Sequence, residues 1–237
     1  MTNIAENVAR IRARMDEAAR ACGRDPAEIS LCAATKMNDA EAVKAAVAAG
    51  VDCCGENRVQ ELLLKQPQGA YDGVPVHFIG HLQTNKVKQV VGKVDLIQSV
   101  DRTELLQCIE KTAAKLGLVQ KILLEVNIGA EESKSGFTPG QAMEIAAHMC
   151  EYPHCQLMGL MAIPPISVEP GGNSKYFAQM RQLIVDIRAK KYDNVHMVCL
   201  SMGMSDDYCD AIAEGSTMVR VGTAIFGARN YAAKEPD

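Results

Sequence analysis

The sequence has no tryptophan, few aromatic residues and no block of basic residues. Aromatic side chains make up 4% of its 237 residues, and the formal net charge is −4. Proteins that bind single-stranded nucleic acid use aromatic side chains as stacking platforms, and nucleic-acid binding in general needs a basic face. We therefore expect no nucleic-acid partner.

Long apolar segments are also missing. No apolar run approaches the roughly 20 residues that a membrane-spanning helix needs. The first 23 residues carry charges throughout, whereas a secretory signal has an apolar centre. We expect no membrane contact and a cytoplasmic location.

The nine cysteines show no spacing typical of a zinc site. Cys53 and Cys54 are adjacent, and Cys150 and Cys155 are too far apart for a CxxC pair. The spacing predicts no metal site, and reduced, buried thiols are the simplest interpretation.

The chain alternates short apolar runs with helical segments. An opening helix over residues 3–22 has apolar residues three and four positions apart, which gives one buried stripe. Predicted strands cover residues 29–36, 51–55, 76–80, 96–100, 121–128, 157–163, 196–202 and 218–226. Predicted helices cover residues 39–49, 59–65, 85–91, 102–116 (capped by Asp101), 139–150 (capped by Thr138), 175–190 and 206–214.

Eight strands, each but the last followed by a helix, are typical of a (β/α)8 TIM barrel. Nearly continuous apolar strands match a parallel sheet that is buried on both faces. The alternative is an open, doubly wound sheet, although no GxGxxG motif follows the first strand. We expect one domain over residues 1–237, a single α/β barrel with an extra N-terminal helix.

Active sites of such barrels lie at the carboxyl ends of the strands. Lys36 ends the first predicted strand and follows small residues. A poorly solvated lysine loses its charge more easily, and the free amine can form a Schiff base with an aldehyde. The alternative is a lysine in a solvated loop or at a helix terminus. Lys134, in the SKSG segment after the fifth strand, is the next candidate, for a substrate anion or for solvent.

A second set of candidates follows strands seven and eight. Ser201, Gly203 and Ser205 lie in one loop, and Gly222 and Thr223 close the last predicted strand. These two loops often bind phosphate in barrels, because glycine admits backbone N–H groups and hydroxyls add donors. The alternative for residues 201–205 is a turn with a helix cap. Phosphate and lysine together indicate a phosphorylated aldehyde, of which pyridoxal 5′-phosphate is the common cellular one.

Arg220 lies inside the apolar run of the last strand. A buried cation is costly without a partner, so one interpretation is a structural ion pair with Asp or Glu. The other is a donor to the pyridine nitrogen of pyridoxal phosphate. Arginine keeps its proton, so that nitrogen stays unprotonated and the ring is a weak electron sink.

The sequence resembles the pyridoxal phosphate homeostasis proteins. Matching segments span nearly the whole chain: AATK (33–36), GENRVQE (55–61), HFIGHLQTNK (77–86), IQSVD (97–101), VNIGAEESKSGF (126–137), LMGLMAIP (157–164), LSMGMSDD (200–207) and GSTMVRVGTAIFGAR (215–229). His81 stands where some members have proline.

The resemblance implies a barrel like the N-terminal domain of alanine racemase, with pyridoxal phosphate as a Schiff base on Lys36. It also implies that Asn57 approaches the cofactor and that Arg220 meets the pyridine nitrogen. The residues implied to hold the phosphate are Ser201, Gly203, Gly222 and Thr223. Lys134 lies in a shared motif without a settled role.

The family resemblance implies a carrier or regulator of intracellular pyridoxal phosphate without catalytic residues and without a metal. Apo-enzymes that use this cofactor are possible partners, and a monomer or weak homodimer is expected. Only ten residues follow Gly227, so we expect no second domain of the kind that supplies a catalytic tyrosine in alanine racemase. A narrow amino-acid racemase or lyase, and a protein that binds another phosphorylated metabolite without a covalent bond, are the alternatives.

Overall fold

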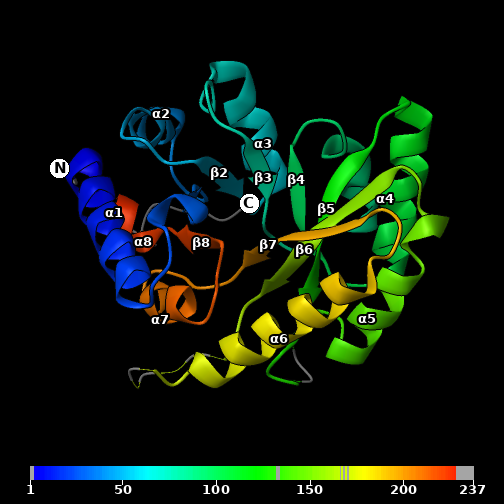
Figure 1. The fold of residues 1–237 in the computed structure, drawn as a ribbon. Coiled ribbons are helices and arrows are strands. Elements are labelled where there is room, and N and C mark those ends of the chain that lie inside the picture. Colours follow the sequence, from blue (N-terminus) through cyan, green and yellow to red (C-terminus); the bar gives the residue numbers. More distant parts are fainter. Residues whose placement is uncertain (1–2, 132–133, 166, 168, 170, 228–237) are drawn as a thin grey trace.

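The structure, a computed structural model, describes residues 3–131, 134–165, 167, 169 and 171–227. These residues form a closed barrel of eight parallel strands that follow one another in sequence order (Figure 1). The strands are β1 (Ser30–Ala34), β2 (Cys53–Glu56), β3 (Val76–Phe78), β4 (Leu96–Val100), β5 (Gln120–Val126), β6 (Cys155–Ala162), β7 (Val195–Ser201) and β8 (Met218–Val221). Because β8 pairs with β1, the predicted TIM barrel is confirmed and the open sheet is excluded.

Helices surround the barrel on its outer face, as Figure 1 shows. The α-helices are α1 (Ile4–Ala21), α2 (Ala40–Ala48), α3 (Val59–Lys65), α4 (Thr103–Leu116), α5 (Pro139–Ala147), α6 (Ser174–Lys190), α7 (Tyr208–Ala213) and α8 (Thr223–Phe226). Four short 3₁₀ turns, η1 to η4, cover Pro26–Glu28, Gln66–Gln68, Thr84–Gln89 and Met149–Glu151.

Helix α1 precedes the first strand and packs beside the last units of the barrel (Figure 1). Its predicted stripe is buried at Val8, Ile11 and Met15, which contributes about 1.5–3 kcal/mol per large side chain. The side chain of Asn7 donates a hydrogen bond of 2.8 Å to the carbonyl of Ile225 in α8. The extra helix thus ties the start of the chain to the end of the barrel.

Three predicted elements differ in the structure. The predicted strand 218–226 is divided into β8 and the short helix α8, so Thr223 lies in a helix and does not close the strand. The predicted helix 85–91 is the 3₁₀ turn η3. Asp101 does not cap α4, because its carboxylate is engaged by His81 and Arg102. The capping box at Thr138 is confirmed.

The inside of the barrel contains several polar side chains, whereas the layer between strands and helices is mainly apolar, apart from buried polar groups between β2 and α3. Barrels of this kind are usually filled with branched apolar residues. Here His77, Gln98, Ser201 and Arg220 are buried and contact one another across the barrel. Buried polar groups are costly unless they are hydrogen-bonded. The hydrogen bonds among these four side chains offset that cost.

Among the helices that the structure describes, none is long and apolar enough to cross a bilayer.

Candidate ligand-binding site at the mouth of the barrel

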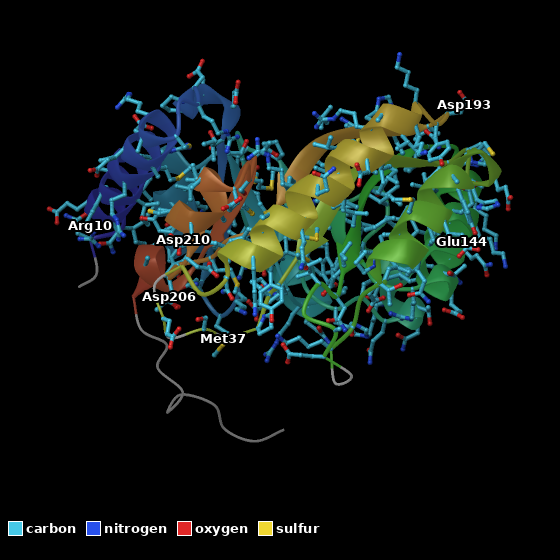
Figure 2. All side chains as sticks on the ribbon, turned by 60° about the horizontal axis from the view of Figure 1, so that its bottom comes forward. Arg10, Met37, Glu144, Asp193, Asp206 and Asp210 are labelled. Carbon is cyan, nitrogen blue, oxygen red and sulfur yellow. The ribbon has the colours of Figure 1, made fainter. Side chains whose placement is uncertain are left out.

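Lys36 lies at the mouth of the barrel, where the strands end. Strand β1 stops at Ala34, so Lys36 is not the last strand residue, as predicted, but stands in the following turn. It is half-buried, and its carbonyl accepts a hydrogen bond of 3.0 Å from the side chain of Asn38. The neighbouring Met37 adopts a left-handed conformation with φ of 63°. Figure 2 places Met37 and Asp206, from the loop after β7, on the same side of the molecule.

A buried cluster of polar side chains, the Lys65 cluster, supports this turn from below. It comprises Thr35, Glu56, Glu61, Lys65 and Tyr71. The Lys65 ammonium lies 2.8 Å from Oε1 of Glu56 and 3.0 Å from Oε2 of Glu61. Tyr71 and Thr35 donate hydrogen bonds of 2.9 and 2.6 Å to the same Oε1 atom. Glu56 is fully buried, and such a charge is tolerated only when it is paired and hydrogen-bonded.

The Lys65 cluster holds the backbone on both sides of Lys36. On one side, Lys65 donates a hydrogen bond of 2.9 Å to the carbonyl of Thr35. On the other, the N–H of Met37 donates a bond of 2.7 Å to Oε2 of Glu61. These contacts hold a turn that contains a strained, positive-φ residue. The direction in which Lys36 leaves the backbone is therefore fixed by α3 and β2.

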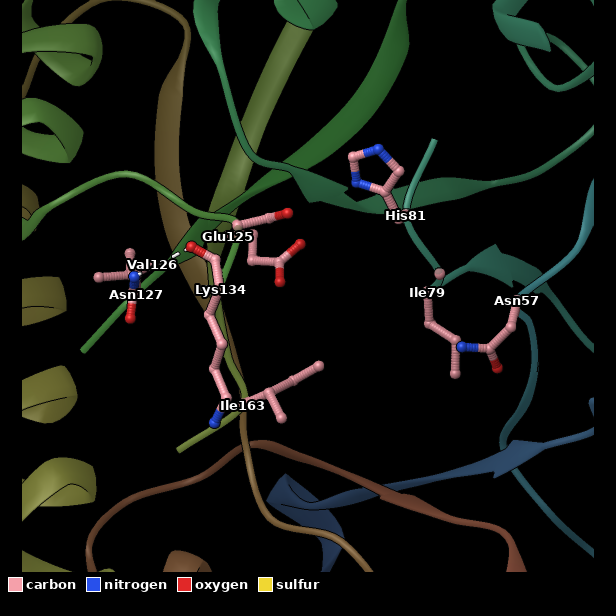
Figure 3. Close-up of a pocket in the computed structure, with 10 residues that line it drawn as sticks. Asn57, Ile79, His81, Glu125, Val126, Asn127, Lys134 and Ile163 are labelled. Atoms are coloured by element: carbon pink, nitrogen blue, oxygen red, sulfur yellow. Dashed lines mark hydrogen bonds between the residues drawn. The ribbon is translucent and has the colours of Figure 1, made fainter. Parts of the chain in front are cut away.

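Next to this turn, a pocket of about 350 Å³ opens between the ends of β2, β3, β5 and β6. Figure 3 shows Asn57 on one side of it and Glu125 and Lys134 on the other. Oδ1 of Asn57 is buried and, within the described part of the chain, has no hydrogen-bond partner. Gly80 packs so closely that a Cβ atom there would lie 2.2 Å from the carbonyl oxygen of Asn57. The close contact fixes Asn57 at the wall of the pocket.

Lys134 lines the same pocket, and it forms an ion pair with Glu131 at 2.7 Å. Its ammonium also donates to the carbonyl of Pro164 at 3.3 Å. Ser133, in the predicted SKSG loop, lies outside the described residues. His81, on the opposite wall, pairs with the buried carboxylate of Asp101 at 2.9 Å. Both residues thus shape the wall of the pocket through their own partners.

Glu125 stands at the end of β5, and burial raises its pKa from 4.5 to about 7. The nearby carboxylate of Asp101 raises the pKa further, and Arg220 opposes both effects. The side chain therefore changes charge close to neutral pH at the edge of the pocket.

Replacing Glu125 with glutamine is expected to raise the free energy of unfolding, relative to the wild type, more at pH 8 than at pH 5. The folded pKa lies above the unfolded one, so the wild type loses stability as pH rises from about 4.5 to 7, by at most about 3 kcal/mol. Glutamine has no charge to desolvate. Denaturant unfolding of both proteins at the two pH values measures the difference. An equal pH dependence in both would show that Glu125 does not titrate in this range.

Arg220 is buried in β8, and no described carboxylate forms an ion pair with its guanidinium. Its two terminal nitrogens donate to Oγ of Ser201 at 2.7 Å and to the carbonyl of Ala162 at 2.9 Å. Burial lowers its pKa from the ordinary value. The ion pair with Asp or Glu considered from the sequence is thus absent among the described residues, and the hydrogen bonds of the guanidinium go to a hydroxyl and a carbonyl.

Ser201 connects Arg220 to the centre of the barrel. Its hydroxyl accepts from Arg220 and donates a bond of 2.7 Å to Oε1 of Gln98. The amide nitrogen of Gln98 lies 2.9 Å from Nδ1 of His77. The hydroxyl of Ser201 therefore holds the arginine, and a continuous hydrogen-bond chain runs from the mouth into the barrel.

Gly203 lies in the loop after β7, and Gly222 follows β8. These two segments contact each other, because the N–H of Ala224 donates a hydrogen bond of 3.4 Å to Oγ of Ser205. Gly203 has φ of +90°, and a Cβ atom there would lie 2.5 Å from Cβ of Ala211. A Cβ atom on Gly222 would lie 3.3 Å from the carbonyl of Ala34. The loop of Gly222 thus adjoins the end of β1, and the loop of Gly203 packs against α7.

The structure places most of the predicted site residues around one mouth. Lys36, Gly203 and Gly222 adjoin through β7, β8 and β1, and Asn57 follows on the neighbouring strand β2. Thr223 is exposed in the first turn of α8.

Sequence reasoning missed the Lys65 cluster and Gln98. Glu61 and Lys65 lie four residues apart on a predicted helix, which indicates a pair but not its burial. A glutamine or histidine inside an apolar strand indicates a hydrogen-bond partner within the barrel. Gln98 and His77 each lie in such a strand, and this signal could have indicated their contact.

This fold and site define a barrel of the alanine racemase class. Residues 1–230 match the family described as alanine racemase, N-terminal domain. At 16% identity, an alanine racemase from Clostridium difficile aligns with a TM-score of 0.72 over 96% of this chain and 57% of its own, which shows the shared fold.

Closer relatives define the family. The chain is 43% identical, over 98% of its length and 99% of the relative, to the pyridoxal phosphate homeostasis protein of Pseudomonas aeruginosa. A protein of unknown function from Bifidobacterium adolescentis aligns with a TM-score of 0.88, at 38% identity and 94% coverage of each chain. PipY of Synechococcus elongatus, solved with PLP bound, aligns with a TM-score of 0.81, at 32% identity, over 94% of this chain and all of its own. The chain belongs to the pyridoxal phosphate homeostasis protein family.

Proposed function

We propose that this protein binds pyridoxal 5′-phosphate at the mouth of its barrel and acts in the homeostasis of this cofactor, with the Lys36 amine as the group that bonds to the aldehyde. The observation that carries the proposal is the position of Lys36, in a turn fixed on both sides beside the loops of Gly203 and Gly222. The relatives named above for pyridoxal phosphate homeostasis, and PipY with PLP bound, support it.

The donors at the mouth fit such a ligand. Pyridoxal phosphate is an anion with a ring nitrogen that can accept a hydrogen bond, and Arg220 is a buried cation without a close carboxylate. Arg220, held by Ser201 and the carbonyl of Ala162, is the residue that would donate to the pyridine nitrogen. An anionic ligand offsets part of the cost of burying that charge.

Asn57 and the two glycine loops complete the proposed site. The buried amide oxygen of Asn57, which has no partner among the described residues, is a polar atom that a ligand can satisfy. Gly203 and Gly222 leave room for backbone N–H groups to approach a phosphate, and the hydroxyl of Thr223 is exposed beside them. Ser201 acts in this proposal through Arg220, because its hydroxyl is already engaged.

We infer a carrier and not an enzyme, present in the cytoplasm as one domain that is monomeric or weakly dimeric. When bound, pyridoxal phosphate supplies an aldehyde that reacts reversibly with amines and a ring that withdraws electrons. An arginine at the ring nitrogen keeps that nitrogen unprotonated, which weakens the electron-withdrawing effect. The names of the relatives support a homeostatic role. Apo-enzymes that require the cofactor are the proposed recipients.

Transfer to an apo-enzyme tests this role. The loaded protein is mixed with an apo-form of a pyridoxal phosphate-dependent enzyme, in the presence of a phosphatase that destroys the free cofactor. We expect the enzyme to regain activity with the loaded protein and to stay inactive with the same amount of free cofactor.

The same preparation is tested for catalysis by following the loss of deuterium from Cα of common amino acids. Retention of the cofactor by the loaded protein would contradict the carrier role. Release of deuterium that depends on Lys36 would favour the racemase alternative.

A further inference from the structure

Below the mouth, three side chains that are far apart in the sequence meet inside the barrel. Cys32 lies in β1, Cys53 in β2 and His77 in β3, and all three are buried. One ligand atom from each, the two sulfurs and a ring nitrogen, lie within 4.8 Å of one another. We call these residues the Cys–His cluster. Their spacing of 21 and 24 positions hides them from any motif search.

We propose that the Cys–His cluster binds one thiophilic divalent metal ion, of which Zn²⁺ is the physiological example. This site shares no residue with the proposed pyridoxal phosphate site, although Cys32 pairs with Arg220 between β1 and β8.

The geometry suits such an ion. In tetrahedral coordination, two sulfurs about 2.3 Å from one Zn²⁺ are about 3.8 Å apart, and the ligand atoms of the cluster lie within 4.8 Å of one another. Small side-chain rotations therefore bring the three atoms into coordination distance. Gly55 makes this possible, because a Cβ atom there would lie 2.9 Å from Sγ of Cys32. With any larger residue the sulfur of Cys32 would be displaced.

The chemistry of the ligands selects soft ions. Two thiolates and an imidazole prefer zinc and related metals over magnesium or calcium, which take oxygen ligands. Two thiolates also balance the charge of a divalent ion, which matters in a buried site. Cys199 packs against the group formed by Cys32, Cys53 and Met218.

The contact of His77 with Gln98 decides which ring nitrogen is open to a metal ion. Nδ1 of His77 lies 2.9 Å from the side-chain amide of Gln98, which leaves Nε2 for the metal. A metal-bound histidine donates its other N–H to an acceptor. Metal binding therefore requires the Gln98 amide to turn, so that its oxygen accepts from Nδ1 and gives up the bond from the Ser201 hydroxyl.

The test measures the metal content of the full-length protein. The protein is expressed in medium supplemented with Zn²⁺, because the ligands are buried and the ion must bind before the barrel closes. After dialysis against a weak chelator, we expect one Zn²⁺ per chain by elemental analysis. We expect Cys53→Ala to lose the ion and Cys54→Ala to keep it. Cys54 is the matched control, since it is the adjacent buried thiol but packs in the outer core.

A second measurement covers the case in which Cys53→Ala does not fold. The wild-type protein is refolded with Cd²⁺, and the ultraviolet charge-transfer band of cadmium thiolates is recorded together with the thermal midpoint. A band at one equivalent with a raised midpoint supports the site. Absence of retained metal, or metal that is lost when the exposed Cys22 and Cys150 are replaced with serine, would overturn it.

Discussion

Replacing Lys36 with arginine is expected to abolish covalent capture of pyridoxal phosphate and to weaken its binding by about 100-fold, or about 3 kcal/mol. Arginine keeps the positive charge at the mouth, but a guanidinium does not react with an aldehyde as a free amine does. Phosphate contacts at the glycine loops and the contact with Arg220 are expected to remain. The variant should therefore bind the cofactor weakly and reversibly.

Equilibrium dialysis of both proteins with pyridoxal phosphate measures the loss of affinity. Pyridoxamine 5′-phosphate, which lacks the aldehyde, serves as the matched ligand, and we expect it to bind the wild type and Lys36→Arg equally. Lys134→Ala is the control variant, since Lys134 lines the neighbouring pocket and pairs with Glu131. An unchanged affinity in Lys36→Arg would contradict the assignment of Lys36.

The second large effect is expected at Lys65. Lys65→Met leaves the fully buried carboxylate of Glu56 without a cation and removes the donor to the carbonyl of Thr35. Breaking a buried pair by removing one partner costs about 3–5 kcal/mol. For a protein of this size that corresponds to a fall of about 10 °C in the thermal midpoint.

The same substitution is expected to weaken pyridoxal phosphate binding, because the turn of Lys36 loses one of its two anchors. Lys44→Met is the matched control, since Lys44 pairs with Glu41 on the exposed face of α2 and such pairs contribute little. The double variant Lys65→Met with Glu56→Gln removes the unpaired charge and should recover part of the stability. A Lys65→Met protein as stable as the wild type would show that the pair contributes nothing.

The barrel could be predicted from the sequence because each strand is a short apolar run and each run is followed by a helical pattern. The same reasoning placed Arg220 inside the last strand and Lys36 at the end of the first; the structure has Arg220 within β8 and Lys36 in the turn after β1. It misjudged 218–226, where Gly222 ends β8 and a short helix follows, because apolar residues continue through both elements. It also missed the 3₁₀ form of η3, since local sequence does not separate one tight turn type from another.

The interior contacts could not be predicted, because they depend on which residues meet across the closed barrel. Glu56 and Tyr71 are 15 positions apart, and Gln98 and Ser201 are 103 apart. No local spacing relates such residues. The Cys–His cluster is a further example. In the sequence its two cysteines are 21 positions apart and indicate isolated thiols, but in the sheet they lie side by side on β1 and β2.

The central claim is that Lys36 is the residue that bonds to pyridoxal phosphate, and borohydride reduction followed by peptide mass mapping tests it most directly. The purified protein is incubated with the cofactor, reduced and digested. The account predicts one equivalent of cofactor mass on the peptide that contains Lys36. Cofactor mass scattered over surface lysines, or found on Lys134 alone, would contradict it.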